Sequence, residues 1–406
     1  MTAMLIKLAI RNVFRQRIRS TMTITAIVFG VLSLIISGGF VQDIYVQLGE
    51  SIIRTQTGHI QIYRAGFLER GTRQPERYLI DEPEGLARKI EALPDVREVA
   101  LRLSFSGLVN NGKRDLAVLG EGIQPENEAQ EGQYLSVVEG RNLSEGDTFE
   151  AMIGQGVARS LGLKAGDQIT VVANSIQGSL NTIDLEVVGV FQSFSKDYDA
   201  RAIRISLQAA QDLLYSNSAN ALVIALENTE DTDRAHHTIR NAIDAQFEVS
   251  NWTTLSDFYA NTVALYERQF GVLRLIILAM VVLSVTNTVN MSVVERLGEF
   301  GTMQAMGNKP WLVAKLILTE NIFLGLIGGL LGALLGCLAA VGISAIGIPM
   351  PPPPNSNLGY TAEIRLIPAD VLTAFVIGFA ATVLAAVLPA RRIARTSIID
   401  ALHEAN

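Results

Sequence analysis

Few residues in this chain of 406 have the types and spacing that chemistry requires. The segment GLVNNGK, residues 107–113, has the G-x-x-x-x-G-K spacing of a phosphate-binding loop. Arg114 follows it, so the hydroxyl that would bind magnesium is missing, and we interpret the segment as a β-hairpin turn. No carboxylate or cysteine stands at metal-ligand spacing from the four histidines, His59, His236, His237 and His403. We therefore expect no catalytic residue, metal site or cofactor on this chain.

The most unusual pattern is VVERLGEFGTMQAMGNKPWLVAK, residues 293–315, which lies between two long apolar runs. We predict a helix from about Glu295 to Met306. Its large apolar residues recur every three positions, at Leu297, Phe300, Met303 and Met306. That spacing drifts around a helix and suits a short contact with another protein better than a long seam.

Phe300 is the predicted anchor of this contact, because an aromatic ring fills a pocket at small entropic cost. Arg296 and Glu299 would orient the contact by charge at its rim. Gly298 and Gly301 each cost about 1 kcal/mol of helix stability relative to alanine, which close approach of another backbone would explain. Turn residues then follow the helix, with Gly307, Asn308 and Pro310 separating it from the next one.

Composition places these residues in a membrane protein. Only 18% of residues are charged, and 49% are hydrophobic. Four runs lack charged residues over the roughly 20 residues that a helix needs to cross a bilayer. We predict spans near 21–43, 271–294, 313–345 and 369–390. The single cysteine, Cys337, falls in the third run and is expected only to pack.

Basic residues in the short flanks predict the orientation of the chain. They gather in residues 1–20, in the loop 295–312 and in the tail 391–406, whereas the loop 346–368 holds only Arg365. We therefore expect both termini and the 295–312 loop to be cytoplasmic in a multi-pass membrane protein. Residues 1–20 are predicted to form an amphipathic interfacial helix or simply a positively charged topology anchor.

The segment 44–268 is expected to form a large external domain. Residues 47–268 hold 20 basic and 32 acidic residues, which favours solubility and argues against a nucleic-acid partner. Two β-α-β patterns, at 55–103 and 220–254, predict one split α+β subdomain, and 104–219 predicts an inserted, mostly β subdomain with a helix near 154–163. The expected fold is four membrane helices plus this α+β domain.

Two sets of residues are predicted to mediate helix contacts. One is an apolar stalk series that would line a cavity between protomers or serve ordinary helix packing: Ile44, Leu48, Ile52, Val263, Tyr266 and Phe270. The other consists of glycines four apart that allow close helix approach to a span or a second protomer: Gly325, Gly328, Gly329, Gly332 and Gly336. The segment PMPPPP, 349–354, is expected to be a stiff external connection.

Together these features resemble the ABC transporter permeases of the MacB, FtsX and LolC/LolE superfamily. Three stretches carry the resemblance: LAIRNVFRQRIRSTMT at the start, ERLGEFGTMQAMGNKPWLV in the loop and LPARRIARTSIIDALHE at the end. MIGQGVARSLGLKAGDQITVV with DLEVVGVFQS is similar to the family's inserted Sabre subdomain, and the split part would be the Porter. The connection 173–184 lacks the proline-containing hook of LolC-like chains, which argues against direct chaperone docking.

The resemblance implies a permease subunit without enzyme activity. A separate cytoplasmic ATPase would hold ATP and magnesium and would contact Glu295, Arg296, Leu297, Glu299, Phe300, Gly301, Met303, Ala305, Met306 and Gly307. It also implies a homo- or heterodimer that transmits ATP-driven motion to the external domain and acts on a lipoprotein or other amphiphile. The alternatives are antibiotic or peptide export with a periplasmic adaptor, and FtsX-like signalling to a cell-wall hydrolase.

Overall fold

The computed structural model describes residues 2–71, 78–129, 135–144, 146, 148–193, 195–351 and 359–393. Within these residues four helices are long and apolar enough to cross a membrane. They are α2 (Arg17–Ile52), α10 (Asp257–Glu295), α12 (Pro310–Ile346) and α13 (Pro368–Ile393). The prediction of four membrane helices plus a large external domain is confirmed. The C-terminal stretch from residue 394 onward, with His403, and residues 352–358 of the proline-rich connection lie outside the described residues.

The chain divides into two compact units. One consists of Met1–Tyr45, Val263–Pro349 and Thr361–Asn406, and the other of Val46–Thr262 and Met350–Tyr360. Two of the boundaries, after Tyr45 and before Val263, fall inside the long helices α2 and α10. We call the two parts the helical unit and the external unit, and describe each by itself.

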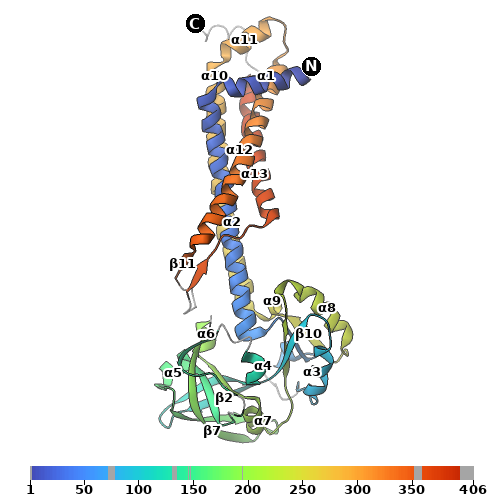
Figure 1. Ribbon diagram of the computed structural model, residues 1–406, viewed down its shortest axis with the longest axis vertical. Coiled ribbons are helices and arrows are strands. Elements are labelled where there is room, and N and C mark those ends of the chain that lie inside the picture. The colour runs from blue at the N-terminus through green and yellow to red at the C-terminus, as the bar shows by residue number, and fades with distance from the viewer. Residues whose placement is uncertain are drawn as a thin grey trace. The chain divides into compact units, whose positions relative to one another are not determined.

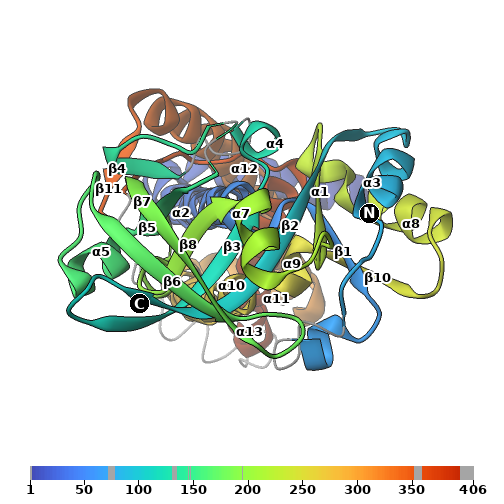
Figure 2. The same cartoon turned by 90° about the horizontal axis from the view of Figure 1, so that it is seen from below.

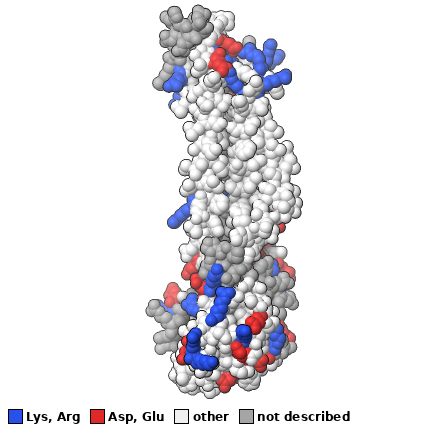
Figure 3. Space-filling view, turned by 90° about the vertical axis from the view of Figure 1, so that its left-hand side faces the viewer, with Lys and Arg blue, Asp and Glu red and all other residues white. Residues whose placement is uncertain are grey.

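In the helical unit, α2, α10, α12 and α13 run side by side, and α1 (Thr2–Arg15) and α11 (Leu297–Ala305) both lie at one end of them (Figure 1). A broad band of its surface carries almost no Lys, Arg, Asp or Glu, and basic side chains gather at the α1 end (Figure 3). This distribution is what a lipid-facing surface with a headgroup-level rim requires.

Helix α1 has two different faces. Ala9 and Val13 are buried in the core of the helical unit. Large apolar side chains on its other face stay exposed, namely Ile6, Leu8, Ile10 and Phe14. Leu8 and Phe14 therefore point away from the buried side, on which Ala9 and Val13 lie. An exposed apolar face beside lysine and arginine side chains suits the membrane interface.

The five glycines expected at helix contacts all lie on α12, in two rows. A Cβ atom built on Gly328, Gly332 or Gly336 would lie 2.9, 2.8 or 2.9 Å from the nearest atom of α2. A Cβ atom on Gly325 or Gly329 would lie 3.3 or 2.8 Å from the nearest atom of α13. The glycines thus bring α12 close to two neighbouring helices of the same chain.

The segment before α13 is tied to the outer half of α2 by Asp43, which is 1% exposed. Its carboxylate accepts a hydrogen bond from the N–H of Glu363 at 2.9 Å and one from Nε of Arg365 at 2.9 Å. The N–H of Arg365 donates to the carbonyl of Gly39 at 3.2 Å. These bonds satisfy a buried carboxylate and fix where the last membrane helix begins. Two short strands, β11 (Ile348–Met350) and β12 (Tyr360–Ala362), also precede α13.

The external unit contains the predicted split α+β subdomain. Its strands form the antiparallel order β10-β1-β9-β2, made of β10 (Phe247–Asn251), β1 (Ile60–Arg64), β9 (Ala221–Leu226) and β2 (Val96–Asn110). Helices α3 (Pro83–Glu91) and α8 (Thr232–Ala242) supply buried side chains to the same core. Strand β10 ends at Asn251, before the end of the predicted β-α-β pattern at residue 254, because Asn251 caps a short helix, α9 (Trp252–Leu255).

The inserted subdomain continues the same sheet. Strand β2 runs on past residue 104 and pairs with both β3 and β6, so the two subdomains share one strand. The remaining strands are β3 (Asp115–Ile123), β4 (Ser136–Gly140), β5 (Glu150–Gly154), β6 (Gln168–Asn174), β7 (Leu180–Gln192) and β8 (Ala202–Ser206). Its helices are α4 (Pro125–Ala129), α5 (Gln155–Leu161), α6 (Lys196–Asp199) and α7 (Leu207–Leu214).

Helix α7 was not anticipated from the sequence. It begins directly after β8, where the Ser206 hydroxyl caps it by accepting a bond from the N–H of Ala209. Its inner face joins the core formed by β2, β3 and β5 to β8, and it lies across β2 and β3 when the sheet is viewed from below (Figure 2). The G-x-x-x-x-G-K lookalike, residues 107–113, consists of the end of β2 and part of the turn that leads to β3, so the predicted β-hairpin is confirmed.

The environment of His59 predicts that the stability of the external unit depends on pH. It is 7% exposed, its Nδ1 accepts a bond from the N–H of Leu226 at 3.2 Å, and Nε2 lies 3.1 Å from the Thr229 hydroxyl. An accepting Nδ1 requires the neutral ring. Burial is the main reason that the pKa of His59 falls to about 4.

Because this pKa is lowered, the unfolded chain binds a proton more readily than the folded one. The contribution of His59 to stability is complete above about pH 6.5 and is lost as the pH falls toward 4, about 2 kcal/mol of it by pH 5. Denaturant titrations of the full chain in detergent, followed by Trp252 fluorescence in a Trp311→Phe background, measure this loss. His59→Gln should flatten the profile between pH 6.5 and 4, and an unchanged profile would contradict the assignment.

Candidate functional site

Helix α11 is a short helix set between the membrane helices α10 and α12. Helix α10 continues to Glu295, and the backbone breaks at Arg296, which has φ −105° and ψ 9°. The helix ends at Ala305, and Gly307 follows with φ +93°, a conformation that favours glycine. Pro310 then begins α12. The predicted break after the helix is confirmed, whereas the start moves from Glu295 to Leu297.

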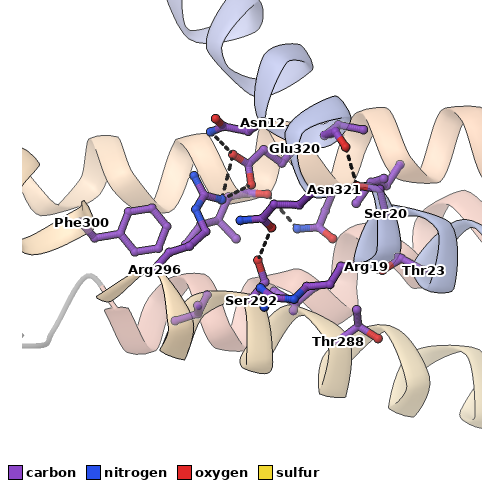
Figure 4. Close-up of a pocket in the computed structure, with 16 residues that line it drawn as sticks. Asn12, Arg19, Ser20, Thr23, Thr288, Ser292, Arg296, Phe300, Glu320 and Asn321 are labelled. Carbon is purple, nitrogen blue, oxygen red and sulfur yellow. Dashed lines mark hydrogen bonds and ion pairs between the residues drawn. The ribbon is translucent and has the colours of Figure 1, made fainter. Parts of the chain in front are cut away.

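A buried ion pair joins the beginning of α11 to α12. Nη1 of Arg296 donates to both carboxylate oxygens of Glu320, at 2.9 and 3.2 Å (Figure 4). Asn12 of α1 donates to the same carboxylate at 2.7 Å. The side chains of Arg296 and Glu320 are only 6% and 11% exposed. One carboxylate therefore links α1, α12 and the α10–α11 junction.

Phe300 lies on the inner face of α11 and is 1% exposed. The guanidinium carbon of Arg296 lies 4.8 Å from the centre of its ring, within the range of a cation–π contact. The ring belongs to the same core as Val289 and Ile317. The expectation that Phe300 anchors the helix in a pocket on another protein is thus corrected, because its pocket is formed by this chain.

Arg296 was expected at the rim of a contact, but it is buried. Glu299 is about half exposed and accepts a bond from Nε of Arg296 at 3.2 Å and another from Arg15. Burial raises the pKa of Glu299, but the bonds from the two arginines outweigh it and hold the pKa below its ordinary value. Glu295 pairs with Arg19 in the same way. Acidic residues of the α10–α11 junction are therefore tied to arginines of the N-terminal helices.

A small polar pocket lies behind these ion pairs (Figure 4). Its volume is about 40 Å³, and its lining includes Gln16, Ser292 and Asn321. Asn321 is 4% exposed, its amide nitrogen donates to the carbonyl of Ile317, and its Oδ1 has no hydrogen-bond partner among the described atoms. Sites for drug-sized ligands occupy roughly 300–1,000 Å³. The pocket is thus a packing junction of polar groups and is too small for an amphiphile.

The outward face of α11 carries the residues that remain available to a partner. Met306 is 72% exposed, and Thr302 and Ala305 are also exposed. Trp311, 50% exposed, continues this surface at the beginning of α12, and the Lys315 amine lies 5.8 Å from its ring centre. Leu297 and Met303 are half-buried, and Gly301 is buried. Of the predicted apolar series, only Met306 is fully presented to solvent.

The stalk series is not an open apolar wall. Ile44, Leu48 and Ile52 are 8%, 3% and 3% exposed, so the chain itself encloses them. For these three residues, burial within the chain favours ordinary helix packing, the second of the two predicted roles. The other members stay half-buried, and Phe270 lies near Phe40 and Tyr266, with ring centres 6.4 and 6.2 Å apart.

Sequence reasoning missed how the polar residues of the site are combined. Asn12 and Gln16 carried no signal, because an amide on an amphipathic helix is ordinary. Glu320 did carry one, since it is the only acidic residue between Glu299 and Glu363. An ionisable residue in an apolar run needs a partner. Across the described part of the chain, no three His, Cys, Asp or Glu side chains are grouped so that they could hold a metal ion.

Two family models match the sequence of this chain. Residues 20–242 match the MacB-like periplasmic core domain, and residues 271–398 match the FtsX-like permease C-terminal domain. The chain is an ABC transporter permease of this family.

Three relatives show how far the similarity of the permease extends. An uncharacterised ABC transporter permease of Methanocaldococcus jannaschii is 24% identical over 98% of this chain and 97% of its own length. The lipoprotein-releasing system transmembrane protein LolC of Neisseria meningitidis is 23% identical over 78% of this chain and 76% of its own. A pyoverdine export ATP-binding/permease protein of Pseudomonas syringae is 25% identical over 98% of this permease but 59% of its own length.

Proposed function

We propose that this permease is the membrane subunit of an ABC transporter whose ATP is hydrolysed on a separate cytoplasmic ATPase. The observation that carries the proposal is the two-sided build of α11. Arg296 and Phe300 hold its inner face against the membrane helices, whereas the Met306 side chain is exposed on its outer face. A helix held on one face and exposed on the other can bind a moving partner and transmit the movement of that partner to α10 and α12. ATP and magnesium would be held by the partner, and this chain would supply no catalytic group.

The proposed orientation follows from charge. Residues 1–20, the loop 295–312 and the tail from 391 would be cytoplasmic, and the external unit would lie beyond the outer face of the inner membrane. The proposed assembly contains two permease protomers, identical or different, and two ATPase subunits. Pairing of two chains would cover part of the apolar surface of α10, where Val272, Leu275 and Met280 are exposed.

The proposed substrate is a lipoprotein or another amphiphile in the outer leaflet. The similarity to LolC over most of both chains supports this class, and the apolar flanks of the membrane helices suit acyl chains, which gain about 0.8 kcal/mol per buried methylene. The β6–β7 connection is a tight turn in which Ser175 and Ser179 bond to each other, so chaperone docking through a long hook is not part of the proposal.

Purification of the complex with its native partners, followed by mass spectrometry of bound lipid and protein, tests the substrate class. Bound acylated protein supports the proposal. Recovery of an adaptor with a small amphiphilic peptide or antibiotic would replace it with export, to which the pyoverdine-export relatives point. Recovery of a cell-wall hydrolase without lipid would replace it with signalling.

Substitutions on the exposed face of α11 test the coupling role. Met306→Glu with Trp311→Ala should release the ATPase from the complex, because a charge and a lost aromatic ring disrupt a hydrophobic contact at its centre. Co-purification of the tagged permease with its ATPase measures the loss. Leu334→Ala is the matched control, since Leu334 is 58% exposed in the middle of α12. Full ATPase recovery with the double variant would show that α11 is not the docking helix.

A further inference from the structure

The outer end of α2 makes an unusual connection with the sheet of the external unit. Helix α2 ends at Ile52 and passes directly into a π-helical turn, Ile53–Thr57. Gly58 closes the turn with φ +61°, and its N–H donates to the carbonyl of Ile53 at 2.8 Å. The last carbonyls of a helix have no partner within the helix, so a buried helix end needs donors from elsewhere.

Three consecutive carbonyls of this turn each accept a bond from a buried side chain. Nη2 of Arg204 donates to the carbonyl of Thr55 at 2.6 Å, and Nη1 of Arg102 donates to that of Gln56. The third bond runs from Nε2 of Gln61 to the carbonyl of Thr57, at 2.7 Å. The three donor residues are 3%, 5% and 5% exposed. Two guanidinium charges at a helix C-terminus also oppose the negative end of its dipole.

The two arginines belong to different parts of the sheet. Arg102 lies on β2, between Leu101 in the core of the split subdomain and Leu103 in the core of the inserted one. Arg204 lies on β8 and stands directly opposite Glu121 of the parallel strand β3. Donors from both subdomains therefore meet on one helical turn.

Other polar groups fix the direction of the Arg204 side chain. The Glu121 carboxylate accepts from Nε of Arg204 at 3.2 Å and from the Tyr198 hydroxyl at 2.9 Å. Burial raises the pKa of Tyr198, so its hydroxyl keeps the proton that it donates. Because the guanidinium is planar, the bond from Nε to Glu121 sets the direction of Nη2, which points to the carbonyl of Thr55.

We propose that Arg102, Arg204 and Gln61 form a clamp on the π-helical turn Ile53–Thr57 that continues α2, and that this clamp makes both external subdomains follow the helix as one body. The inference rests on the proposed function, in which motion that begins at α11 must reach the external unit. Arg102 and Arg204 are positioning residues in this scheme, because they contact neither ATP nor substrate.

Spin labels at Val46 of α2 and Thr182 of β7, in a Cys337→Ser background, test the clamp in the full chain without the ATPase. Both sites are exposed. The parent should give one narrow distance distribution, and Arg102→Gln with Arg204→Gln should make it roughly twice as wide, since the π-helical turn loses two of its three side-chain donors. Arg114→Gln, an exposed arginine on the β2–β3 turn, is the matched control and should change nothing.

The lysine variants Arg102→Lys and Arg204→Lys separate clamping from folding. They keep the charge but lack the planar fork of the guanidinium. Each should therefore give a distance distribution much narrower than that of the double glutamine variant, with the unfolding temperature of the parent. If the double glutamine variant does not fold, these single variants decide, and Arg204→Lys should still broaden the distribution measurably. A narrow, parent-like distribution in every folded clamp variant would overturn the clamp.

A second label pair, at Gly342 of α12 and Thr182, measures ATP-driven motion in the complex with the ATPase. The parent should show a distance shift on ATP turnover, and the folded clamp variants should lose most of that shift while hydrolysing ATP at the parent rate. A full shift in the variants would overturn the clamp. Absence of any shift in the parent would reject the proposed function, and the first label pair would still decide the clamp.

Discussion

Replacement of Glu320 by alanine is expected to destabilise the helical unit by about 3–5 kcal/mol, because it leaves the Arg296 guanidinium buried without its carboxylate. Arg296 is 5% exposed, and the side chain of its remaining ionic partner, Glu299, is about half exposed. Asn12 loses its acceptor at the same time. The first consequence should be detachment of α11 from α12, followed by loss of ATPase binding. Thermal unfolding in detergent and co-purification with the ATPase measure the two effects.

Two controls isolate the buried pair. Glu299→Gln removes a carboxylate that is half exposed, so it should cost under about 1 kcal/mol. Arg296→Met combined with Glu320→Leu removes both charges together and should recover most of the stability, as replacement of a buried pair by apolar residues commonly does. Parent-like unfolding of Glu320→Ala would show that Arg296 reaches solvent in the membrane and that the pair does not hold α11.

The second large effect is expected for Gly332→Leu. A Cβ atom at this position would lie 2.8 Å from Cβ of Val31 and 3.1 Å from Cα of Val28. The second of these atoms belongs to the backbone of α2 and cannot rotate away, so the two helices must separate. Overpacking of this kind costs about 1–3 kcal/mol or more, and the contact of α2 with α12 would be lost along the row that Gly328 and Gly336 continue.

Gly342 supplies the matched control on the same helix. Nothing lies within 4 Å of a Cβ atom built there, so Gly342→Leu should leave stability unchanged or raise it slightly. Unfolding temperatures of the two variants in the same detergent, with the rate of proteolysis in α2, make the comparison. Equal stability of the two variants would mean that α2 and α12 are not packed through this row.

Several features of the protein could be predicted from the sequence because they depend on local composition. Backbone groups in a bilayer must bond within a helix, so long charge-free runs could hardly be anything but membrane helices. The pattern of apolar residues predicted a split α+β subdomain and a mostly β insert in the external unit, and the turn chemistry of Gly307 and Pro310 located the end of α11. Subdomain boundaries were less accessible, because β2 continues through residue 104 without any break in pattern.

The tertiary structure decided which groups meet. Periodicity showed that α11 has an apolar face, but it could not say whether Phe300 points toward another protein or into its own bundle. Arg296 and Glu320 are 24 residues apart, and Asn12 is 308 residues from the same carboxylate, so no local pattern joins them. The same holds for Arg204 and the carbonyl of Thr55, separated by 149 residues. Buried polar groups must be satisfied wherever the fold brings them, and the choice of partner is a property of packing and not of sequence neighbours.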